Sequence, residues 1–450
     1  MGKLFGTDGI RGVANVAPMD SETIMRVGRA AAYVLRRSQG RHRILIGKDT
    51  RVSGYMLETA LASGISSMGV DVLLVGPLPT PGVAFMTRSM RADAGCMISA
   101  SHNPYEDNGV KFFGADGFKL PDATESEIEY LMEPGHLDEL RAVPELIGKA
   151  FRIDDAVGRY AVYVKSSVER DANFEGLKVV MDCANGAAYK IAPLVYSELG
   201  AKVIAVANEP DGQNINLRCG SLHPEAMCEV VREYGADLGI AFDGDSDRVI
   251  MCDENARLYD GDSLLAICAT AYKREGKLKG NAVVGTVMSN LGLELSLRER
   301  GISLFRSDVG DRYVLAEMLA RGLNLGGEQS GHIISLDHNT TGDGLLVSLL
   351  VISIMLKSGK PLSQFSSLVE RHPQVLVNVP VREKLPFEQC PKITSAIKKV
   401  EGRLNNVGRV LLRYSGTEFK ARVMVEAADK ELCTTMANEL AMVVQQELGR

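Results

Sequence analysis

An apolar run, a helical stretch, a glycine and a second apolar run follow one another three times along this chain of 450 residues. The three copies cover residues 44–75, 179–206 and 283–305, and their glycines are Gly69, Gly200 and Gly301. This order is typical of a βαβ unit, in which helices cover a parallel sheet. Three such units indicate three separate α/β domains, because one hydrophobic core rarely serves more than about 250–300 residues.

The expected helices of these copies span residues 57–68, 191–199 and 291–300. The last part of the chain has another pattern. An alternating strand over 375–381 and a helix over 393–400 are expected there, then strands over 410–412 and 422–425 and a closing helix over about 430–448. These elements predict a small α+β domain, with a boundary near His372–Pro373 and a hinge near residues 368–373.

Charge and cysteine usage exclude several classes of protein. A formal net charge of −6 argues against a general nucleic-acid binder, so local clusters of lysine and arginine must hold any anionic substrate. The eight cysteines include no Cys-x-x-Cys pair and are expected to be reduced core residues. The N-terminus lacks the apolar core of a signal peptide, and the most apolar stretch, 344–356, is too short to span a bilayer. We therefore expect a cytoplasmic protein with no nucleic-acid or membrane partner.

Three carboxylates occupy alternate positions of one loop, at Asp243, Asp245 and Asp247. Carboxylates this close repel one another unless a cation such as Mg²⁺ lies among them. An EF-hand is rejected, because Arg248 stands where that loop needs glycine and the flanking runs are typical of strands. A solvated acidic turn stays open for this loop judged alone, and so does a phosphatase with an aspartate nucleophile.

A serine loop follows the apolar run at residues 96–98. Ser101 precedes the turn-forming pair Asn103–Pro104, and a serine in this position is more often a turn cap than a nucleophile. Lys111 follows closely, and a lysine near phosphate and metal can have a lowered pKa and so move protons for a sugar hydroxyl. Its alternative role is that of a surface ammonium.

Two further loops carry groups suited to a sugar and to phosphate. Residues 326–332 contain glycines that let the backbone approach a ligand, with Glu, Ser and His side chains to contact hydroxyls. Residues 413–418 combine arginine, hydroxyls and glycine, with Arg422 downstream, which is typical of an anion site. Each loop is also compatible with an ordinary surface turn, and so are the basic segments 7–12 and 47–51.

The four loops, in this order, closely resemble those of the α-D-phosphohexomutase superfamily. They read Ser-His-Asn-Pro at 101–104, Asp-Gly-Asp-Ser-Asp-Arg at 243–248, Gly-Glu-Gln-Ser-Gly-His at 327–332 and Arg-Tyr-Ser-Gly-Thr-Glu at 413–418. The resemblance spans nearly the whole chain, and segments such as Asn-Ile-Asn at 214–216 are similar to those of members that act on glucosamine phosphate. The chain departs from the pattern at Leu222, Phe419 and Ala421, which leaves the shape of the phosphate clamp open.

The resemblance implies a role for each matching residue. Ser101 would be the phosphorylated serine and would bind Mg²⁺ together with Asp243, Asp245 and Asp247. Lys111, His332, Arg11 and Arg248 would act in catalysis beside it. The substrate would be held by Glu328 and Ser330, which would grip the sugar, and by Arg413, Ser415, Gly416, Thr417 and Arg422, which would clamp its unreactive phosphate.

The resemblance also implies four domains around a central cleft. They would be a phosphoserine domain at 1–153, a metal-binding domain at 154–254, a sugar-binding domain at 255–369 and a C-terminal phosphate-binding domain at 370–450. The first three would be mixed α/β domains of related topology.

The implied reaction interconverts glucosamine 6-phosphate and glucosamine 1-phosphate, in amino-sugar metabolism toward UDP-GlcNAc and peptidoglycan precursors. A sugar 1,6-bisphosphate would serve as primer and intermediate, and the partner would be a small phosphosugar. Mannose or glucose phosphates, a metal-dependent sugar phosphatase and a non-catalytic sugar-phosphate binder are the alternatives, and a homodimer stays open.

Overall fold

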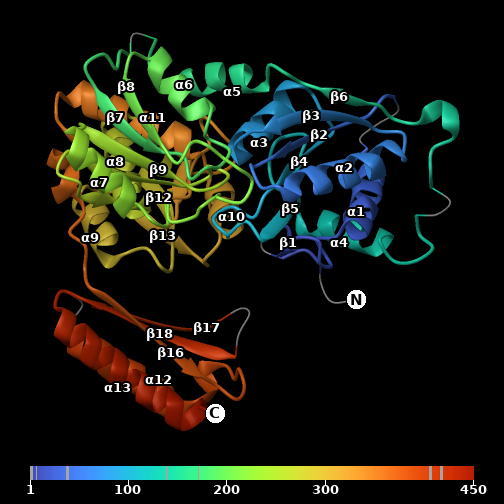
Figure 1. Cartoon of the computed structure of the whole chain (residues 1–450). Helices are drawn as coiled ribbons and strands as arrows, with labels where there is room; N and C mark the ends of the chain where they lie inside the picture. The colour runs from blue at the N-terminus through green and yellow to red at the C-terminus, as the bar shows by residue number, and fades with distance from the viewer. Residues whose placement is uncertain are drawn as a thin grey trace.

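The computed structural model describes residues 4–6, 8–36, 40–137, 140–170, 172–404, 408–415 and 419–450. The strands in this part of the chain form four separate sheets of six, five, four and three strands. Figure 1 shows the first three regions side by side in one elongated body, with the C-terminal region below one end of it. The predicted fold class, three mixed α/β domains followed by a C-terminal α+β domain, is confirmed.

The first sheet has the order β1-β5-β4-β2-β3-β6. Its strands are β1 (Ile10–Val13), β2 (Arg43–Lys48), β3 (Asp71–Pro77), β4 (Ala94–Ile98), β5 (Asp107–Gly114) and β6 (Ala150–Arg152). Its helices are α1 (Ser21–Val34), α2 (Ser53–Ser66), α3 (Thr80–Ser89) and α4 (Asp122–Leu131). Strands β2, β3, β4 and β6 are parallel, whereas β5 runs antiparallel to β4 and β1 antiparallel to β5.

The second and third sheets have the orders β11-β10-β9-β7-β8 and β13-β12-β14-β15. The second contains β7 (Lys178–Asp182), β8 (Lys202–Val206), β9 (Leu238–Phe242), β10 (Val249–Asp253) and β11 (Leu258–Tyr259), with helices α5 (Ala156–Lys165), α6 (Ile191–Glu198) and α7 (Glu225–Tyr234). The third contains β12 (Ala282–Thr286), β13 (Ser303–Ser307), β14 (Leu325–Gly327) and β15 (Ile333–Ser335), with helices α8 (Gly261–Arg274), α9 (Leu291–Glu299), α10 (Asp311–Arg321) and α11 (Gly344–Ser358).

The three sheets share one unit. In each, a central parallel strand (β2, β7 or β12) pairs with the next strand along the chain on one side and with a third parallel strand on the other. That third strand (β4, β9 or β14) is followed by an antiparallel neighbour. The predicted glycine stops lie inside these units with left-handed backbones, at φ 81° for Gly69, 98° for Gly200 and 65° for Gly301. Glycine reaches this conformation without steric cost.

The C-terminal sheet has the order β16-β18-β17 and is antiparallel. Its elements are β16 (Gln374–Pro380), α12 (Pro391–Leu404), β17 (Gly408–Tyr414), β18 (Lys420–Ala427) and α13 (Lys430–Leu448). Apolar side chains on alternate positions of the strands pack against both helices in a separate core. The helices therefore cover one face of the sheet, and Figure 1 shows its other face turned toward the remaining domains.

The first three domains are joined by buried apolar contacts. One hydrophobic core runs from Val83 in α3 through Tyr160 in α5 to helix α11, so it crosses from the first domain to the third. Helix α11 is buried except in its last turn, and the Asp343 side chain caps it by accepting a hydrogen bond from the Leu346 amide. These domains form one packed body, whereas the C-terminal domain has its own core.

The apolar α11 bears on membrane association. No single helix in the described ranges is long and apolar enough to cross a membrane. Helix α11 and the 3₁₀ helix η3 (Leu362–Leu368) meet the criteria of length and composition only when taken together, and they are bent by 100° relative to each other.

Candidate active site

Three of the four loops singled out in the sequence occupy the same position in their domains. The Ser101 loop joins β4 to β5, the aspartate loop joins β9 to β10, and residues 328–332 join β14 to β15. Each loop thus leaves the carboxyl end of a parallel strand, which is where open α/β sheets bind ligands. The side chains of these loops meet in one buried cluster, described below.

Ser101 is buried, and its hydroxyl donates a hydrogen bond to Asp243 Oδ2 at 2.6 Å. Its backbone has a φ of 52°, a left-handed conformation that is uncommon for residues other than glycine. Strained conformations of this kind persist where the surrounding structure fixes them, and they cluster at functional sites. The serine of the first domain therefore lies directly on the acidic loop of the second.

Asp243, Asp245 and Asp247 each offer an oxygen within 4.8 Å of the other two, and all three are buried. Burial, together with the negative charges of Asp247 and Asp245, holds the pKa of Asp243 well above its ordinary value. The Oδ1 atoms of Asp245 and Asp247 are buried and have no hydrogen-bond partner among the described residues. Buried carboxylate oxygens without donors are costly, and they fit a hard divalent cation that takes oxygen ligands.

Lys111 on β5 is almost fully buried among carboxylates. Its Nζ lies 3.0 Å from Asp245 Oδ2 and 3.1 Å from Asp8 Oδ2. Burial alone would lower the pKa of Lys111, but Asp245, Asp8 and Asp247 outweigh it and raise the pKa above its ordinary value. The lowered pKa expected from the sequence is therefore wrong for this arrangement, because the local position of Lys111 did not reveal how many carboxylates surround it.

Arg248 links the aspartate loop to the serine loop. Its backbone N–H donates to Asp243 Oδ1 at 3.2 Å, and its Nη1 lies 3.0 Å from Nδ1 of His102. Burial and the charges of Arg248 and Arg11 lower the pKa of His102 to about 4, so this imidazole is neutral and its Nδ1 accepts. The Arg248 guanidinium of the second domain is thus held next to His102, the neighbour of Ser101 in the first domain.

His332, the last residue of the third loop, is buried with two kinds of neighbour. The Gly342 amide donates to its Nε2 at 3.1 Å, while its Nδ1 lies 3.6 Å from Asp247 Oδ1. Nε2 also lies 3.7 Å from Asp311 Oδ2. Burial alone would lower the pKa of His332, but Asp247 and Asp311 outweigh it and raise the pKa to about 9. The ring can therefore accept from Gly342 when neutral and face a carboxylate when protonated.

Three charged residues that the sequence reasoning missed complete the cluster. Asp8 pairs with Arg11, Lys111 and Lys119, and Lys119 also reaches Asp311 at 2.5 Å. Burial would raise the pKa of Asp8, but these cations hold it well below its ordinary value. Asp8 lies in the basic segment 7–12 that the sequence had singled out, but nothing local indicates that Lys119 would join it to Asp311 of the third domain.

The loop at residues 326–332, which is expected to contact the sugar, contributes Glu328 and Ser330. Glu328 Oε1 accepts a hydrogen bond from the Gly310 amide at 3.0 Å, and its charge acts on both Arg248 and His332. Ser330 is exposed at the tip of the same turn. The loop thus presents the Glu328 carboxylate, which the Gly310 amide holds, and the exposed Ser330 hydroxyl next to the buried cluster.

The described residues of the expected phosphate site lie in the C-terminal domain. Arg413 on β17 and Arg422 on β18 are directly opposite each other in the ladder, and the Arg422 Nη2 atom lies 3.5 Å from Ser415 Oγ. Like charges opposite each other destabilise a sheet, so the pair is suited to holding an anion. Burial and the charge of Arg422 lower the pKa of Arg413. The predicted ligands Gly416 and Thr417 lie outside the described residues.

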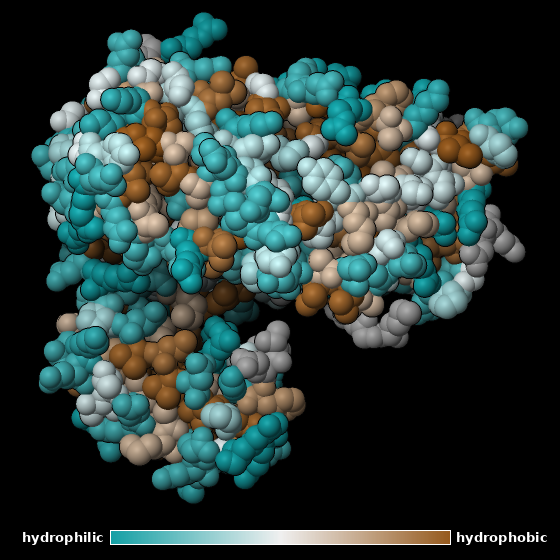
Figure 2. Space-filling view, in the orientation of Figure 1, coloured by the Kyte–Doolittle hydropathy of each residue, from teal (hydrophilic) through white to brown (hydrophobic). Residues whose placement is uncertain are grey.

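Both arginines are on the sheet face that the helices leave uncovered, turned toward the other domains. Figure 2 shows a deep hollow between the C-terminal domain and the body above it. Of the departures from the expected motif, Ala421 is buried in the core, whereas Phe419 and Leu222 are exposed at 54% and 53%. The arginine pair and the Ser101 cluster therefore lie in different domains.

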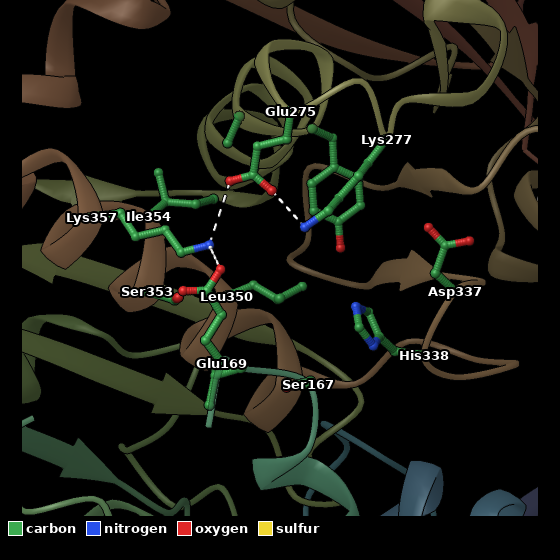
Figure 3. Close-up of a pocket in the computed structure, with 13 residues that line it drawn as sticks. Ser167, Glu169, Glu275, Lys277, Asp337, His338, Leu350, Ser353, Ile354 and Lys357 are labelled. Atoms are coloured by element: carbon green, nitrogen blue, oxygen red, sulfur yellow. Dashed lines mark hydrogen bonds and ion pairs between the residues drawn. The ribbon is translucent and has the colours of Figure 1, made fainter. Parts of the chain in front are cut away.

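A further cavity of about 370 Å³ lies between the end of α5 and helices α8 and α11 (Figure 3). Its lysines are paired with acids, Lys357 with Glu169 at 2.6 Å and Lys277 with Glu275 at 2.6 Å. The residues that line it include none of the loop side chains described above. The charges of these two lysines are therefore neutralised locally.

Comparisons with known proteins cover the whole chain. Four family models match, described as phosphoglucomutase/phosphomannomutase alpha/beta/alpha domains I (residues 2–137), II (158–257) and III (260–372) and C-terminal domain (376–443). The chain is 58% identical over 449 residues to a phosphoglucosamine mutase of Citrifermentans bemidjiense, covering 100% of this chain and 99% of the relative. It is 55% identical over 447 residues to that of Myxococcus xanthus, covering 99% and 98%.

Solved structures share the fold at lower identity. A phosphoglucomutase/phosphomannomutase family protein from Burkholderia thailandensis has a TM-score of 0.81 at 22% identity and covers 100% of this chain and 99% of its own. The Aspergillus fumigatus N-acetylphosphoglucosamine mutase, solved in complex with GlcNAc-6P and magnesium, has a TM-score of 0.67 at 17% identity and covers 98% and 95%. The resemblance expected from the four loops is confirmed. The predicted domain boundaries at residues 153, 254 and 369 stay a prediction.

Proposed function

Because the chain belongs to the phosphoglucomutase/phosphomannomutase family, we propose that it interconverts glucosamine 6-phosphate and glucosamine 1-phosphate through a phosphoserine at Ser101. The relatives of 55–58% identity that are named phosphoglucosamine mutase, each matched over nearly its full length, support the choice of sugar. The observation that carries the proposal is the 2.6 Å hydrogen bond from Ser101 Oγ to Asp243. This hydrogen bond joins the proposed nucleophile of the first domain to the aspartate loop of the second.

The residues that would hold Mg²⁺ are Asp243, Asp245 and Asp247, together with an oxygen of the phosphorylated Ser101. When bound, the ion neutralises phosphate charge and makes the serine oxygen a better leaving group. The chain's own contribution is positioning, since phosphoryl transfer needs alignment and charge stabilisation more than covalent chemistry. Arg248, whose Nη1 lies 3.0 Å from His102 Nδ1, and Arg11, whose charge acts on the same imidazole, are proposed to support the phosphate on Ser101.

In the proposed cycle, the distal phosphate of the sugar binds the Arg413–Arg422 pair while its free hydroxyl faces Ser101. The hydroxyl oxygen bonds to the phosphorus as the bond from phosphorus to Ser101 Oγ breaks. The sugar hydroxyl gives up its proton in this step, and Oγ takes up one proton. The product is a 1,6-bisphosphate, which turns around and returns its other phosphate to the serine. Lys111 and His332 are the groups proposed to hold and move the proton. Lys111, whose Nζ lies 3.0 Å from Asp245 Oδ2, is proposed as the donor of the proton that Oγ takes up.

The arginine pair predicts a binding defect. Arg422→Ala should raise KM for glucosamine 6-phosphate about 10- to 100-fold with a smaller effect on kcat, because a charge-assisted hydrogen bond to phosphate contributes about 1.5–3 kcal/mol to binding. Steady-state kinetics check this. Lys392→Ala removes an exposed cation of the same domain that pairs with Glu447, and it should leave KM unchanged. A fall in kcat alone for Arg422→Ala would contradict the clamp.

The choice of sugar rests on the relatives and on Gln329, whose Nε2 is buried without a partner between Glu328 and Ser330. A coupled assay with Mg²⁺ and a bisphosphate primer should compare glucosamine 6-phosphate, mannose 6-phosphate and glucose 6-phosphate at equal concentration. We expect kcat/KM to be highest for glucosamine 6-phosphate. A preference for either neutral sugar would overturn the substrate assignment and leave the mutase mechanism in place.

A further inference from the structure

Two residues that are not among the predicted site residues donate hydrogen bonds to backbone carbonyls of the Ser101 loop. The Nη2 atom of Arg51 donates to the carbonyl oxygens of Ser101 at 3.2 Å and of Asn103 at 2.5 Å. Asn216 Nδ2 donates to the same two carbonyls, each at 2.9 Å. Arg51 belongs to the first domain and Asn216 to the second, so each carbonyl receives one donor from either side of the domain junction.

Arg51 has no freedom to move away from this position. Its side chain is completely buried and forms an ion pair with Asp49. The Arg51 amide also donates to Asp49 Oδ1 at 2.9 Å, and the Asp49 amide donates to the Ile98 carbonyl at the end of β4. The basic segment 47–51, for which the sequence left both a functional role and an ordinary turn open, therefore supports the serine loop from the inside.

Asn216 is held equally firmly, on a loop of the second domain. Its backbone is left-handed, with a φ of 59°, and its amide donates to the Ala184 carbonyl at 2.9 Å. The buried Asp182 ties this region together, because it accepts from the amides of Ala184 at 2.9 Å and Gly220 at 2.7 Å. The side-chain amide therefore approaches Ser101 from a fixed point.

The Ser101 carbonyl also faces the aspartate loop at residues 243–248. A Cβ atom on Gly244 would lie 2.6 Å from this oxygen and 2.9 Å from Asn216 Nδ2, so only glycine fits between Asp243 and Asp245. The carbonyl is thus enclosed by Arg51, Asn216 and Gly244 while the hydroxyl of the same residue contacts Asp243. Any rotation of the Ser101 backbone out of its left-handed conformation would break this enclosure and turn Oγ away from the aspartates.

We propose that Asn216 and Arg51 are positioning residues for phosphoryl transfer, which hold the Ser101 backbone so that its oxygen stays aligned with Asp243. The inference rests on the proposed role of Ser101 as phosphoryl carrier. Neither residue needs to touch the sugar, so loss of the Asn216 amide should slow transfer without weakening substrate binding. Misplacement of a reacting group by about 1 Å can cost about 100-fold in rate.

The test uses Asn216→Gly and Asn216→Asp. Both replacements tolerate a left-handed backbone; the first removes the amide, and the second keeps its size but replaces the donor with an acceptor. Each enzyme is phosphorylated with a hexose 1,6-bisphosphate and mixed with glucosamine 6-phosphate in a rapid-quench apparatus. Transfer from the serine should slow about 10- to 100-fold, with KM within about threefold of wild type.

The matched control is Asn214→Gly in the same loop. Asn214 Nδ2 donates to the Glu209 carbonyl rather than to the serine loop, so this variant should transfer phosphate at the wild-type rate. Wild-type transfer rates in both Asn216 variants, a defect confined to KM, or an equal loss in Asn214→Gly would overturn the inference. If the wild-type enzyme itself carries no transferable phosphate on Ser101, the proposed function fails and the inference falls with it.

Discussion

Ser101→Ala should abolish mutase turnover, lowering kcat by roughly 10⁴-fold or more, because the chain then has no oxygen to carry the phosphoryl group. The hydroxyl lies 2.6 Å from Asp243 in a buried site, whereas the nearby Thr80 hydroxyl donates to Asp245 Oδ2 at 2.6 Å. The coupled assay, with glucosamine 6-phosphate, Mg²⁺ and a bisphosphate primer, measures the effect. The protein should stay folded, since alanine accepts the same backbone conformation as serine at comparable cost.

Two controls separate chemistry from folding. Ser358→Ala removes a hydroxyl that only donates to the Met355 carbonyl at the end of α11, and it should keep full activity. Thermal unfolding of Ser101→Ala should resemble that of the wild type. Wild-type-like turnover in Ser101→Ala would refute the phosphoserine mechanism.

Asp243→Asn is expected to have the second-largest effect. The loss of one of three carboxylates should reduce kcat by at least about 100-fold, more than the 10- to 100-fold typical of residues that only support a metal ligand. At the same time the unfolding temperature without Mg²⁺ should rise or stay constant, because Asp243 repels Asp245 and Asp247 and its pKa is held high. Activity and thermal melts with and without EDTA check both parts.

The matched control for this change is Glu229→Gln, which neutralises an exposed carboxylate of the same domain. It should alter neither activity nor the stabilisation that Mg²⁺ gives the wild-type protein. In contrast, Asp243→Asn should lose that stabilisation. A variant with full Mg²⁺ stabilisation but no activity would show that the aspartates do not form the metal site.

Periodicity and glycine stops were sufficient to predict the fold. The closing helix predicted at about 430–448 is α13, Lys430–Leu448, and the helix predicted at 291–300 is α9, Leu291–Glu299. The helix predicted at 57–68 begins earlier, at Ser53, because Ser53 and Gly54 carry no apolar signal although their backbone is already helical. Because a sequence pattern reflects only local structure, the predicted boundaries differ from the observed ones by a few residues. The predicted elements themselves are present.

The site was predictable only in part, because it is assembled across domains. Ser101 and the three aspartates carry their chemistry in their own loops, and their meeting follows from the shared position of those loops after a parallel strand. Lys119 carries no such local signal, since its importance comes from pairing with Asp8 of its own domain and with Asp311 of the third. The surroundings that raise the pKa of Lys111 are likewise set by folding rather than by spacing.

The most direct measurement is to locate the phosphate during turnover. The enzyme should be labelled with a ³²P-hexose 1,6-bisphosphate, digested and mapped by mass spectrometry before and after a chase with glucosamine 6-phosphate. The predicted result is one labelled peptide, phosphorylated at Ser101, that loses its label to the sugar at the rate of turnover. Label on an aspartate of the 243–247 loop, or label on Ser101 that survives the chase, would contradict the role of Ser101 as the phosphoryl carrier.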